Sequence, residues 1–292
     1  MAVPYSQTIS QYLDNHTYIK SGNSWRTVED VRIKSGGTWR DVKTVYIKSG
    51  NSWRTVHEGD HFLFNYTDSS NSQSELTLSS ILSNAGYSSG SIKGAITINC
   101  KRKRLNLGNY SGKVYLRVNS NKKISGSGGN GGNRGGQNGA VGMDGLYSGG
   151  TPFLLDNAGF IAGGGGGGGG GQNAQCTYQN TYTYGCMKGN QCQGTDQQFA
   201  TANGGGGGGG AGYPGGQGKH GGQNGTETGG GGGGGNGGCG SNSGGKGGNL
   251  GQAGQNAGGN GGAKGKAIVG NNHKIGNVGS GEGDLRGGTS NT

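Results

Sequence analysis

The five histidines of this 292-residue chain are the first candidates for acid–base chemistry or metal binding, and their spacing supports neither. They lie scattered at His16, His57, His61, His220 and His273, with no His-x-x-x-His or His-Glu-x-x-His pair. Such pairs set two imidazoles on one face of a helix, which is how many zinc enzymes hold their metal. We therefore expect no metal site and no catalytic histidine.

Phosphate and zinc motifs are absent as well. Gly265-Lys266 is followed by Ala267 instead of Ser or Thr, and Gly-x-Gly-x-x-Gly matches carry no information in a chain with 77 glycines. The cysteines lack Cys-x-x-Cys spacing, which argues against zinc; they are Cys100, Cys176, Cys186, Cys192 and Cys239. We expect no enzyme and no cofactor, and for a protein made in the cytosol free thiols are the default.

Composition excludes an ordinary globular protein. Glycine supplies 67 of residues 125–292, hydrophobic residues make up only 27 % of the chain, and three prolines are too few for collagen. Residues 1–124 hold 17 Lys/Arg against 8 Asp/Glu, a net +9, and residues 125–292 hold 8 against 6, a net +2. Met1–Ser10 has no signal-peptide pattern, so we expect synthesis in the cytoplasm and no membrane insertion.

Residues 1–60 contain a 14-residue unit repeated three times, from YIKSGNSWRTVEDV at residue 18. Each unit reads as a β-hairpin with a glycine turn, and the second strand carries Trp25, Trp39 or Trp53. We expect the Ile, Trp and Val side chains to pack around a threefold axis, which suits a symmetric trimeric partner. A flat meander without a partner is the alternative.

Residues 61–124 are predicted to form a compact β-rich adaptor. Strands are expected at His61–Tyr66, Ile92–Asn99 and Lys113–Asn119, where apolar and polar residues alternate. Glu75–Ala85 is expected to be a short helix that ends at Gly86.

Residues 125–292 are predicted to form a bundle of extended glycine helices with three residues per turn. Glycine recurs at every third residue, as in Gly126, Gly129, Gly132 and Gly135. Such helices bond only to their neighbours, so glycine is needed wherever two backbones approach. Runs without side chains, Gly163–Gly171, Gly204–Gly210 and Gly229–Gly235, are expected to be enclosed. A disordered linker is the alternative.

Aromatic-rich inserts interrupt the glycine segments and are the candidate recognition loops. Loops on a rigid scaffold commonly carry recognition, and tyrosine offers a large contact area at low entropic cost. Phe153–Leu155 and Phe160-Ile161 would serve equally well as plugs at the bundle's ends. The candidate contacts are Tyr147, Phe153, Leu154, Tyr178, Tyr182, Tyr184, Met187, Lys188, Phe199, Tyr213 and His220.

These glycine motifs resemble those of the receptor-recognising adhesins at the tips of long tail fibres in T-even-type bacteriophages. The resemblance rests on Gly159-Phe160-Ile161-Ala162 before nine glycines, on Ser127–Gly132, and on the alternation of glycine motifs with inserts over residues 126–290. It implies a sandwich of polyglycine II helices whose loops choose a bacterial outer-membrane protein or surface glycan. It also implies a place at the distal tip of the fibre in the virion.

The resemblance further implies roles for particular residues. Trp25, Trp39 and Trp53 would attach the chain to a trimeric fibre protein, and the inserts would bind the host; these are Leu146–Ala158, Gln172–Asn203, Gly212–Thr228 and Ala267–Val278. Because a virion functions outside the cell, a disulfide such as Cys176–Cys186 is a hypothesis for the largest insert.

Two other functions remain open from the sequence. The basic run Lys101–Arg104 and the RGG-like Arg134-Gly135-Gly136 and Arg286-Gly287-Gly288 are compatible with a glycine-rich nucleic-acid binder. The basic run is more readily read as a solvated hairpin edge between strands, and we expect no nucleic-acid partner. A purely structural or ice-binding glycine protein would show flat polar faces without aromatic inserts.

Overall fold

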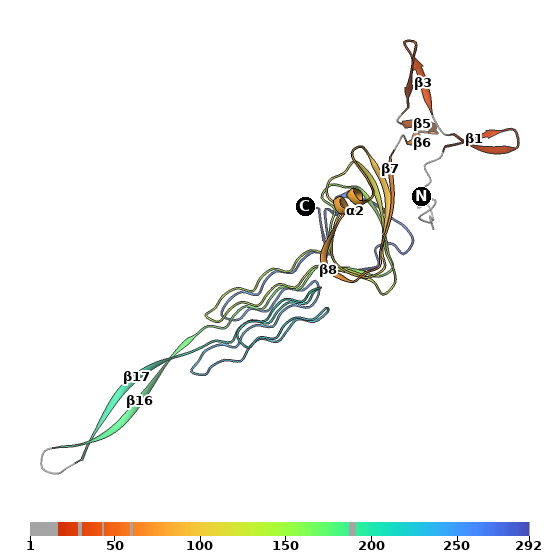
Figure 1. Cartoon of the computed structure of the whole chain (residues 1–292). Coiled ribbons are helices and arrows are strands. Elements are labelled where there is room, and N and C mark those ends of the chain that lie inside the picture. Colours follow the sequence, from red (N-terminus) through yellow and green to blue (C-terminus); the bar gives the residue numbers. More distant parts are fainter. Residues whose placement is uncertain (1–16, 29–30, 43, 59–60, 187–190, 292) are drawn as a thin grey trace.

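The structure of the chain is a computed structural model that describes residues 17–28, 31–42, 44–58, 61–186 and 191–291. Separate N-terminal hairpins lead to a β-sheet core that carries helix α2 (Leu78–Asn84). Extended glycine-rich segments then project from the core and end in a long hairpin (Figure 1). Met187 and Lys188 lie outside the described residues, and so does the side chain of Trp25.

The 14-residue repeats form separate antiparallel hairpins whose strands are β1 (Thr17–Ser21) with β2 (Ser24–Val28), β3 (Arg32–Ser35) with β4 (Thr38–Asp41), and β5 (Thr44–Ser49) with β6 (Ser52–Glu58). In the second hairpin, Trp39 pairs with Lys34 and Ile33 with Arg40, which places Trp39 and Ile33 on opposite faces. Both are exposed, by 62 % and 57 %. The expected joint packing of Ile, Trp and Val is therefore wrong for the side chains that the structure describes.

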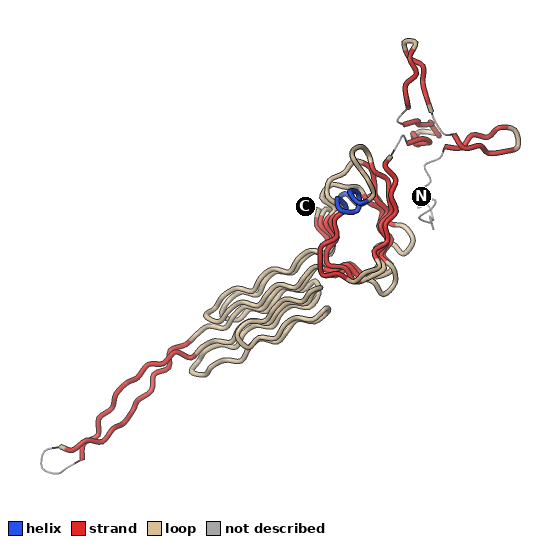
Figure 2. The backbone as a smooth tube through the Cα atoms, in the orientation of Figure 1, coloured by secondary structure: helices blue, strands red, loops and turns tan. Residues whose placement is uncertain are grey.

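The core winds through two sheets of parallel strands. One has five strands in the order β19-β14-β11-β9-β7, and the other has eight, in the order β20-β15-β12-β10-β13-β18-β21 with β8 beside β10. From β7 to β12 successive strands alternate between the sheets, so each circuit of the chain extends both (Figure 2).

The first circuits use β7 (Phe62–Asp68), β8 (Ser72–Thr77), β9 (Ile92–Ile98), β10 (Lys101–Asn106), β11 (Gly112–Val118) and β12 (Lys123–Ser125). Later circuits add β13 (Leu146–Tyr147), β14 (Phe153–Asn157), β15 (Phe160–Ala162), β18 (Ile268–Val269), a 3-10 turn η1 (Asn271–His273), β19 (Lys274–Asn277), β20 (Asp284–Arg286) and β21 (Thr289–Ser290). The strands expected at three places in residues 61–124 correspond to β7, β9 and β11.

One apolar core unites the two sheets and the helix. Ile96 and Leu116 from the five-stranded sheet are buried together with Leu105 and Ile161 from the eight-stranded sheet and Leu82 from α2. Strands from beyond residue 125 complete both sheets, because the glycine-rich segments leave the core and return to it. The boundary expected at 124/125 therefore does not separate two structural units.

Helix α2 is shorter than the predicted Glu75–Ala85 and begins after Thr77. The Thr77 side chain accepts a hydrogen bond from the backbone N–H of Ser80, which caps the first turn. Glu75 instead belongs to β8 and pairs with Lys103. After the helix, Gly86 has a φ of 85°, in the left-handed region that ends helices.

The basic run Lys101–Arg104 is not a solvated edge between strands but part of β10, inside the eight-stranded sheet. Arg102 is 8 % exposed, and its Nε and Nη2 donate to the Asp68 carboxylate at 2.5 and 2.7 Å. Arg104 lies beside Glu75, with 3.7 Å between Nε and Oε1. Acidic partners thus neutralise much of the charge that would serve a nucleic-acid binder.

The glycine run 163–171 is enclosed by neighbouring segments, as expected. Its amides donate in turn to three neighbouring segments. The first segment accepts from Gly164, Gly167 and Gly170, through the carbonyls of Met143, Ala140 and Gln137. The second accepts from Gly165, Gly168 and Gly171, through Ala211, Gly208 and Gly205, and the third accepts from Gly166 and Gly169, through Gln252 and Gln255. Every third amide therefore faces the same neighbour. The carbonyls of this run accept from three other segments, at residues 129–135, 245–251 and 259–265.

The run 204–210 is enclosed in the same way, but Gly229–Gly235 is not. Residues 204–210 are buried, and the amides of 205–210 donate to segments at 242–245, 220–223 and 129–132. In contrast, Gly235 is exposed, and a Cβ added there would meet nothing within 4 Å, while one at Gly232 would meet only the Gln223 side chain. The expectation of enclosure is wrong for Gly229–Gly235, because a run without side chains permits enclosure but does not require it.

We call the end of the glycine segments beside β12 and β15 the proximal end, and the end beside Gly171 and Gly204 the distal end. At the proximal end Glu227 joins the segments to the core. Its Oε2 accepts from Lys123 Nζ at 2.8 Å and from Lys101 Nζ at 3.0 Å. Hydrogen bonds from Lys123 and Lys101 lower the pKa of the Glu227 carboxyl, against the opposing effect of its partial burial.

Replacing Glu227 by glutamine is expected to lower the thermal midpoint near neutral pH and to have no such effect in acid. The folded-state pKa of Glu227 lies below its ordinary value, so its stabilisation is present above that ordinary value and is lost as pH falls through the lowered pKa. Thermal unfolding of both proteins from about pH 7 down to about pH 3 measures the difference. A constant difference over this range would contradict the ion-pair role.

Candidate functional site

The longest excursion from the glycine segments is the hairpin of β16 (Ala174–Gly185) and β17 (Gln191–Ala202). It extends beyond the distal end, away from the core and the N-terminal hairpins (Figure 1). Its strands continue directly from the two enclosed runs, 163–171 and 204–210. The Gly171 amide donates to Gly205, and the Gly204 amide donates to Asn173 Oδ1 at 2.9 Å, so the two runs are joined where the hairpin begins.

One face of this hairpin is a stripe of tyrosines. Tyr178, Tyr182 and Tyr184 are separated by even intervals along β16, which places them on one face. They are 45 %, 51 % and 49 % exposed, and the rings of Tyr182 and Tyr184 lie 5.9 Å apart. A Cβ at Gly194, opposite Tyr182, would come within 3.0 Å of the Tyr182 ring, so the missing side chain leaves room for that ring.

Polar groups accompany the tyrosines on the same face. In register with β16, Gln198 pairs with Tyr178, and Asp196 pairs with Asn180. Phe199 is 67 % exposed but pairs with Thr177, so it belongs to the opposite face, among threonines and glutamines. Sequence reasoning selects the aromatic residues and misses Asn180, Asp196 and Gln198. The strand register places these polar residues beside the tyrosines, and composition alone does not.

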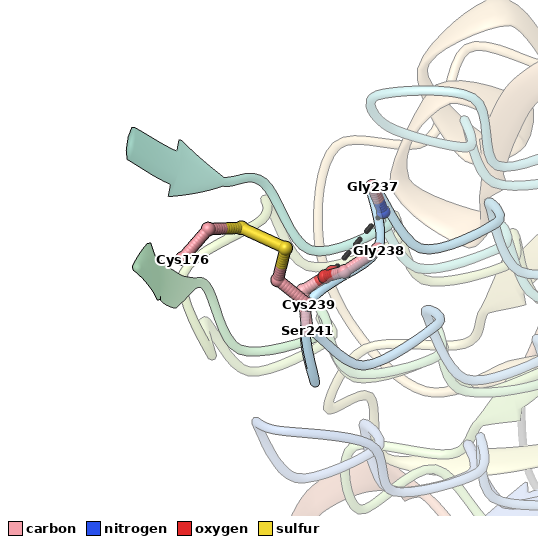
Figure 3. The surroundings of a disulfide bond; sticks show 5 residues. All are labelled: Cys176, Gly237, Gly238, Cys239 and Ser241. Atoms are coloured by element: carbon pink, nitrogen blue, oxygen red, sulfur yellow. Dashed lines mark hydrogen bonds between the residues drawn. A yellow bond between two sulfur atoms is a disulfide. The ribbon is translucent and has the colours of Figure 1, made fainter. Parts of the chain in front are cut away.

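A disulfide from Cys176 to Cys239 links the base of β16 to a distal turn of another glycine segment (Figure 3). Cys239 has a φ of 50°, a backbone conformation that L residues seldom adopt. In the same turn, Ser241 Oγ donates to Gly238 O and accepts from the Gly237 amide. The turn thereby holds Cys239 facing the hairpin.

The second disulfide, Cys186–Cys192, closes the tip of the hairpin, and Cys100 remains a buried free thiol. The hypothesis of a Cys176–Cys186 bond is wrong: these residues lie at opposite ends of one extended strand, a separation no disulfide can span. Cys239 lies far away in the sequence, and only the direction of each glycine segment reveals that its turn shares the distal end with Cys176.

Thiol titration of the unfolded chain is expected to find one reactive cysteine before reduction and five afterwards, since Cys100 is the free thiol and the sequence has five cysteines. Cys239→Ser should release Cys176 alone and leave Cys186–Cys192 intact, which peptide mapping without reduction detects. A peptide that joins Cys176 to Cys186 in the wild-type chain would contradict the pairing.

Other predicted contacts divide between the two ends. His220 lies in a distal turn, where its carbonyl accepts from Gly206. Tyr213 lies at the proximal end, with its ring 5.4 Å from Lys123 Nζ, and its amide donates to Gly126. The insert Gly212–Thr228 therefore contributes to both ends, and Tyr213 is placed away from the hairpin.

The inserts Leu146–Ala158 and Ala267–Val278 are not distal loops, because they supply strands β13, β14, β18 and β19 of the core. Phe153 is fully buried in the apolar cluster, and Leu154 is half-buried against Tyr115. Tyr147 is 36 % exposed in β13, with the Arg104 guanidinium 5.5 Å from its ring. The prediction of Phe153 as a receptor contact is thus wrong, because it is a core residue. Leu154 and Tyr147 lie in strands β14 and β13 of the core, away from the distal end.

At the opposite end from the long hairpin, Trp39 and Trp53 are 62 % and 67 % exposed. Lys34 Nζ lies 5.9 Å from the Trp39 ring. Trp25 lies in β2. The exposed Trp39 and Trp53 form a second candidate surface, in which the aromatic rings remain available to a partner.

The described part of the chain offers no group of three or more His, Cys, Asp or Glu residues placed to hold a metal ion. Among its helices none has the length and apolar character required to span a membrane. The β16/β17 face described above presents exposed aromatic rings, side-chain amides and one carboxylate.

Comparisons with known proteins give the family. A family model described as phage tail fibre adhesin Gp38 matches residues 63–290. Among solved structures, the chain is similar to a chain of the crystal structure of the gp37-gp38 adhesin tip complex of the bacteriophage S16 long tail fiber. The identity is 20 %, the TM-score is 0.48, and the match covers 79 % of this chain and 83 % of that chain. A comparison with curated proteins gives no match. Since the family model spans well over half of its length, the chain belongs to the phage tail fibre adhesin family Gp38.

Proposed function

We propose that this tail fibre adhesin binds a receptor on the bacterial outer membrane through its distal end and thereby determines host range. The observation that carries the proposal is the tyrosine face of β16/β17. Three half-exposed tyrosines stand on a hairpin that continues from the two enclosed glycine runs and is cross-linked at its base. Tyrosines on a preorganised support lose little conformational entropy on binding, as in antibody paratopes.

The scaffold that we propose for this surface is a sandwich of polyglycine II helices. The supporting observation is that every third amide of residues 163–171 donates to the same neighbouring segment. That repeat matches a helix with three residues per turn, whose backbone groups bond only between helices. Such a scaffold would hold the distal turns and the hairpin in fixed relative positions.

For the N-terminal end we propose attachment to a trimeric tail-fibre protein. The repeated hairpins lie away from the distal end, and Trp39 and Trp53 are exposed there (Figure 1). This arrangement leaves the β16/β17 hairpin free when the other end is occupied. The adhesin would then sit at the distal tip of the fibre in the virion, after synthesis in the host cytoplasm.

A reciprocal experiment tests both ends. Tyr178→Ala/Tyr182→Ala/Tyr184→Ala should lower adsorption of reconstituted phage at least about tenfold, the loss expected from truncating central aromatic contacts, while leaving assembly on the fibre intact. Trp39→Ala/Trp53→Ala should prevent assembly on the fibre, while the isolated adhesin still binds susceptible cells. Each variant is the folding control for the other. Undiminished adsorption by the tyrosine variant would mean that the tyrosine face of β16/β17 does not bind the receptor.

A further inference from the structure

The β16/β17 hairpin has long free edges of a kind that natural proteins usually protect. It is a two-stranded sheet in which every residue from Ala174 to Gly185 pairs with one from Gln191 to Ala202 without a register shift. The outer edge of each strand therefore presents a row of backbone N–H and C=O groups that the partner strand does not use. Such an edge is a template for another strand.

The features that usually prevent a sheet edge from pairing with another strand are absent from β16. Edges are commonly blocked by lysines, prolines or bulges. The sequence of β16, AQCTYQNTYTYG, has no charged residue and no proline, and its pairing has no bulge. In β17 the single charged residue is Asp196. The β16 edge is thus the less protected of the two.

The N-terminal hairpins of the same chain provide the contrast. Their strands span 4 to 7 residues, against 12 in β16. Their first strands carry Lys20, Lys34 and Lys48 as the last residue but one, before the serine that precedes the turn. The two-stranded N-terminal sheets thus carry lysines in their strands and are short, whereas strands β16 and β17 contain no lysine and are long.

Side chains on β16 also suit an incoming strand. Tyr178, Tyr182 and Tyr184 all belong to β16 and share one face. Residues of a strand added at that edge would lie directly beside them, and aromatic residues form favourable cross-strand pairs with aromatic or β-branched neighbours. Strand addition uses main-chain hydrogen bonds for affinity and side-chain contacts for specificity.

We propose that the β16 edge binds an extended polypeptide segment of the receptor by β-strand addition, which makes the receptor contact a protein and not a glycan. The inference rests on the proposed function and narrows it to one class of partner. Saccharides offer no regular row of N–H and C=O groups to match the edge. A second copy of the chain on this edge is the competing occupant.

The first test uses the full-length chain and outer-membrane vesicles of a susceptible strain, either untreated, shaved with protease or oxidised with periodate. Binding to untreated and oxidised vesicles with loss on the shaved ones is expected. Binding that survives protease and is lost with periodate would overturn strand addition but not the adhesin function. No binding to untreated vesicles would overturn both. The free chain could instead sediment as a dimer, and Thr181→Lys could convert that dimer to a monomer. This result would mean that the β16 edge binds a second copy of the chain, and it would overturn the proposal.

Amide exchange at single-residue resolution provides the second test. In the free chain, alternate β16 amides should exchange fast because they face outward. On untreated vesicles these amides should slow at least about tenfold, as expected of newly hydrogen-bonded groups, while the outward amides of β17 remain fast. Vesicle binding without slower amide exchange at the β16 edge would mean that side chains alone make the contact. It would overturn strand addition but not the proposed adhesin function.

A matched pair of proline variants completes the design. Thr181 pairs with Thr195, and Asn180 with Asp196; in an antiparallel ladder the two members of a pair have the same amide orientation. Whichever pair has fast amides decides the substitution: Thr181→Pro with Thr195→Pro as control, or Asn180→Pro with Ala200→Pro as control. Ala200 pairs with Cys176 and, four residues from Asp196 along β17, has the same amide orientation as Asp196 without belonging to the polar groups beside the tyrosines. Proline at an outward position keeps the hairpin and removes one donor. Vesicle affinity should fall about two- to tenfold for β16, as for one lost hydrogen bond, and stay unchanged for β17. Equal effects on both strands would contradict the proposal.

Discussion

Gly167→Ala is expected to unfold the glycine-rich segments, with a loss of about 3 kcal/mol or more in unfolding free energy, at the upper end of overpacking effects. A Cβ at Gly167 would lie within 3.0 Å of the Asn130 carbonyl and the Gly131 amide. Both obstacles are backbone, so no side-chain rotation can relieve the clash. The added methyl would also separate Gly167 from Ala140 and Gly262, its hydrogen-bond partners.

Gly235→Ala is the matched control, because a Cβ there meets nothing within 4 Å and the backbone lies outside the left-handed region. Its effect should stay within about 0.5 kcal/mol, as for ordinary surface changes. Urea unfolding of both variants, together with amide exchange at residues 163–171, measures the difference. Equal stability of the two variants would mean that the close backbone packing does not hold the segments together.

Asp68→Ala is expected to cost about 3–5 kcal/mol, because it leaves the Arg102 guanidinium buried without its counter-charge. Both groups are buried, at 3 % and 8 % exposure, and the carboxylate accepts two hydrogen bonds from Arg102. Asp41→Ala is the control, since its ion pair with Arg32 has side chains that are 78 % and 54 % exposed. Exposed pairs contribute at most about 1 kcal/mol.

A double variant and a thiol probe make this prediction specific. Asp68→Ala/Arg102→Met should regain part of the lost stability, since it removes the unpaired charge. Burial, together with Asp68, raises the pKa of the nearby Cys100 thiol to about 11. In Asp68→Ala alone, Cys100 should react faster with thiol reagents because the surrounding core opens more often. An Asp68→Ala protein as stable as the Asp41→Ala control would contradict the structural role of the pair.

Sequence alone predicts the periodic parts of this fold and misses what depends on chain direction. The alternation in residues 92–99 and 113–119 predicts strands that the structure has as β9 and β11, because a period of two follows directly from strand geometry. The three-residue glycine repeat likewise predicts segments that bond to one another. It cannot tell which turn lies at which end, and so the sequence groups Tyr213 and Phe153 with the distal tyrosines.

The candidate site shows the same division. Tyr178, Tyr182 and Tyr184 follow from composition, since aromatic residues in a glycine-poor insert call for an explanation. The Cys176–Cys239 link and the Asp196–Asn180 pair do not, because both depend on contacts made only after the chain has turned back. Likewise, in the sequence Arg102 reads as a solvated cation, and only the folded structure shows that it is buried beside Asp68.

The connection of the hairpin to the two enclosed glycine runs has a mechanical consequence. A pulling force on the hairpin would pass along residues 163–171 and 204–210, while their hydrogen bonds run across to neighbouring segments. The load therefore acts on these bonds in shear, and neither run can slide without breaking many of them together. A load on the hairpin would thus be borne collectively by the backbone hydrogen bonds of the glycine-rich segments.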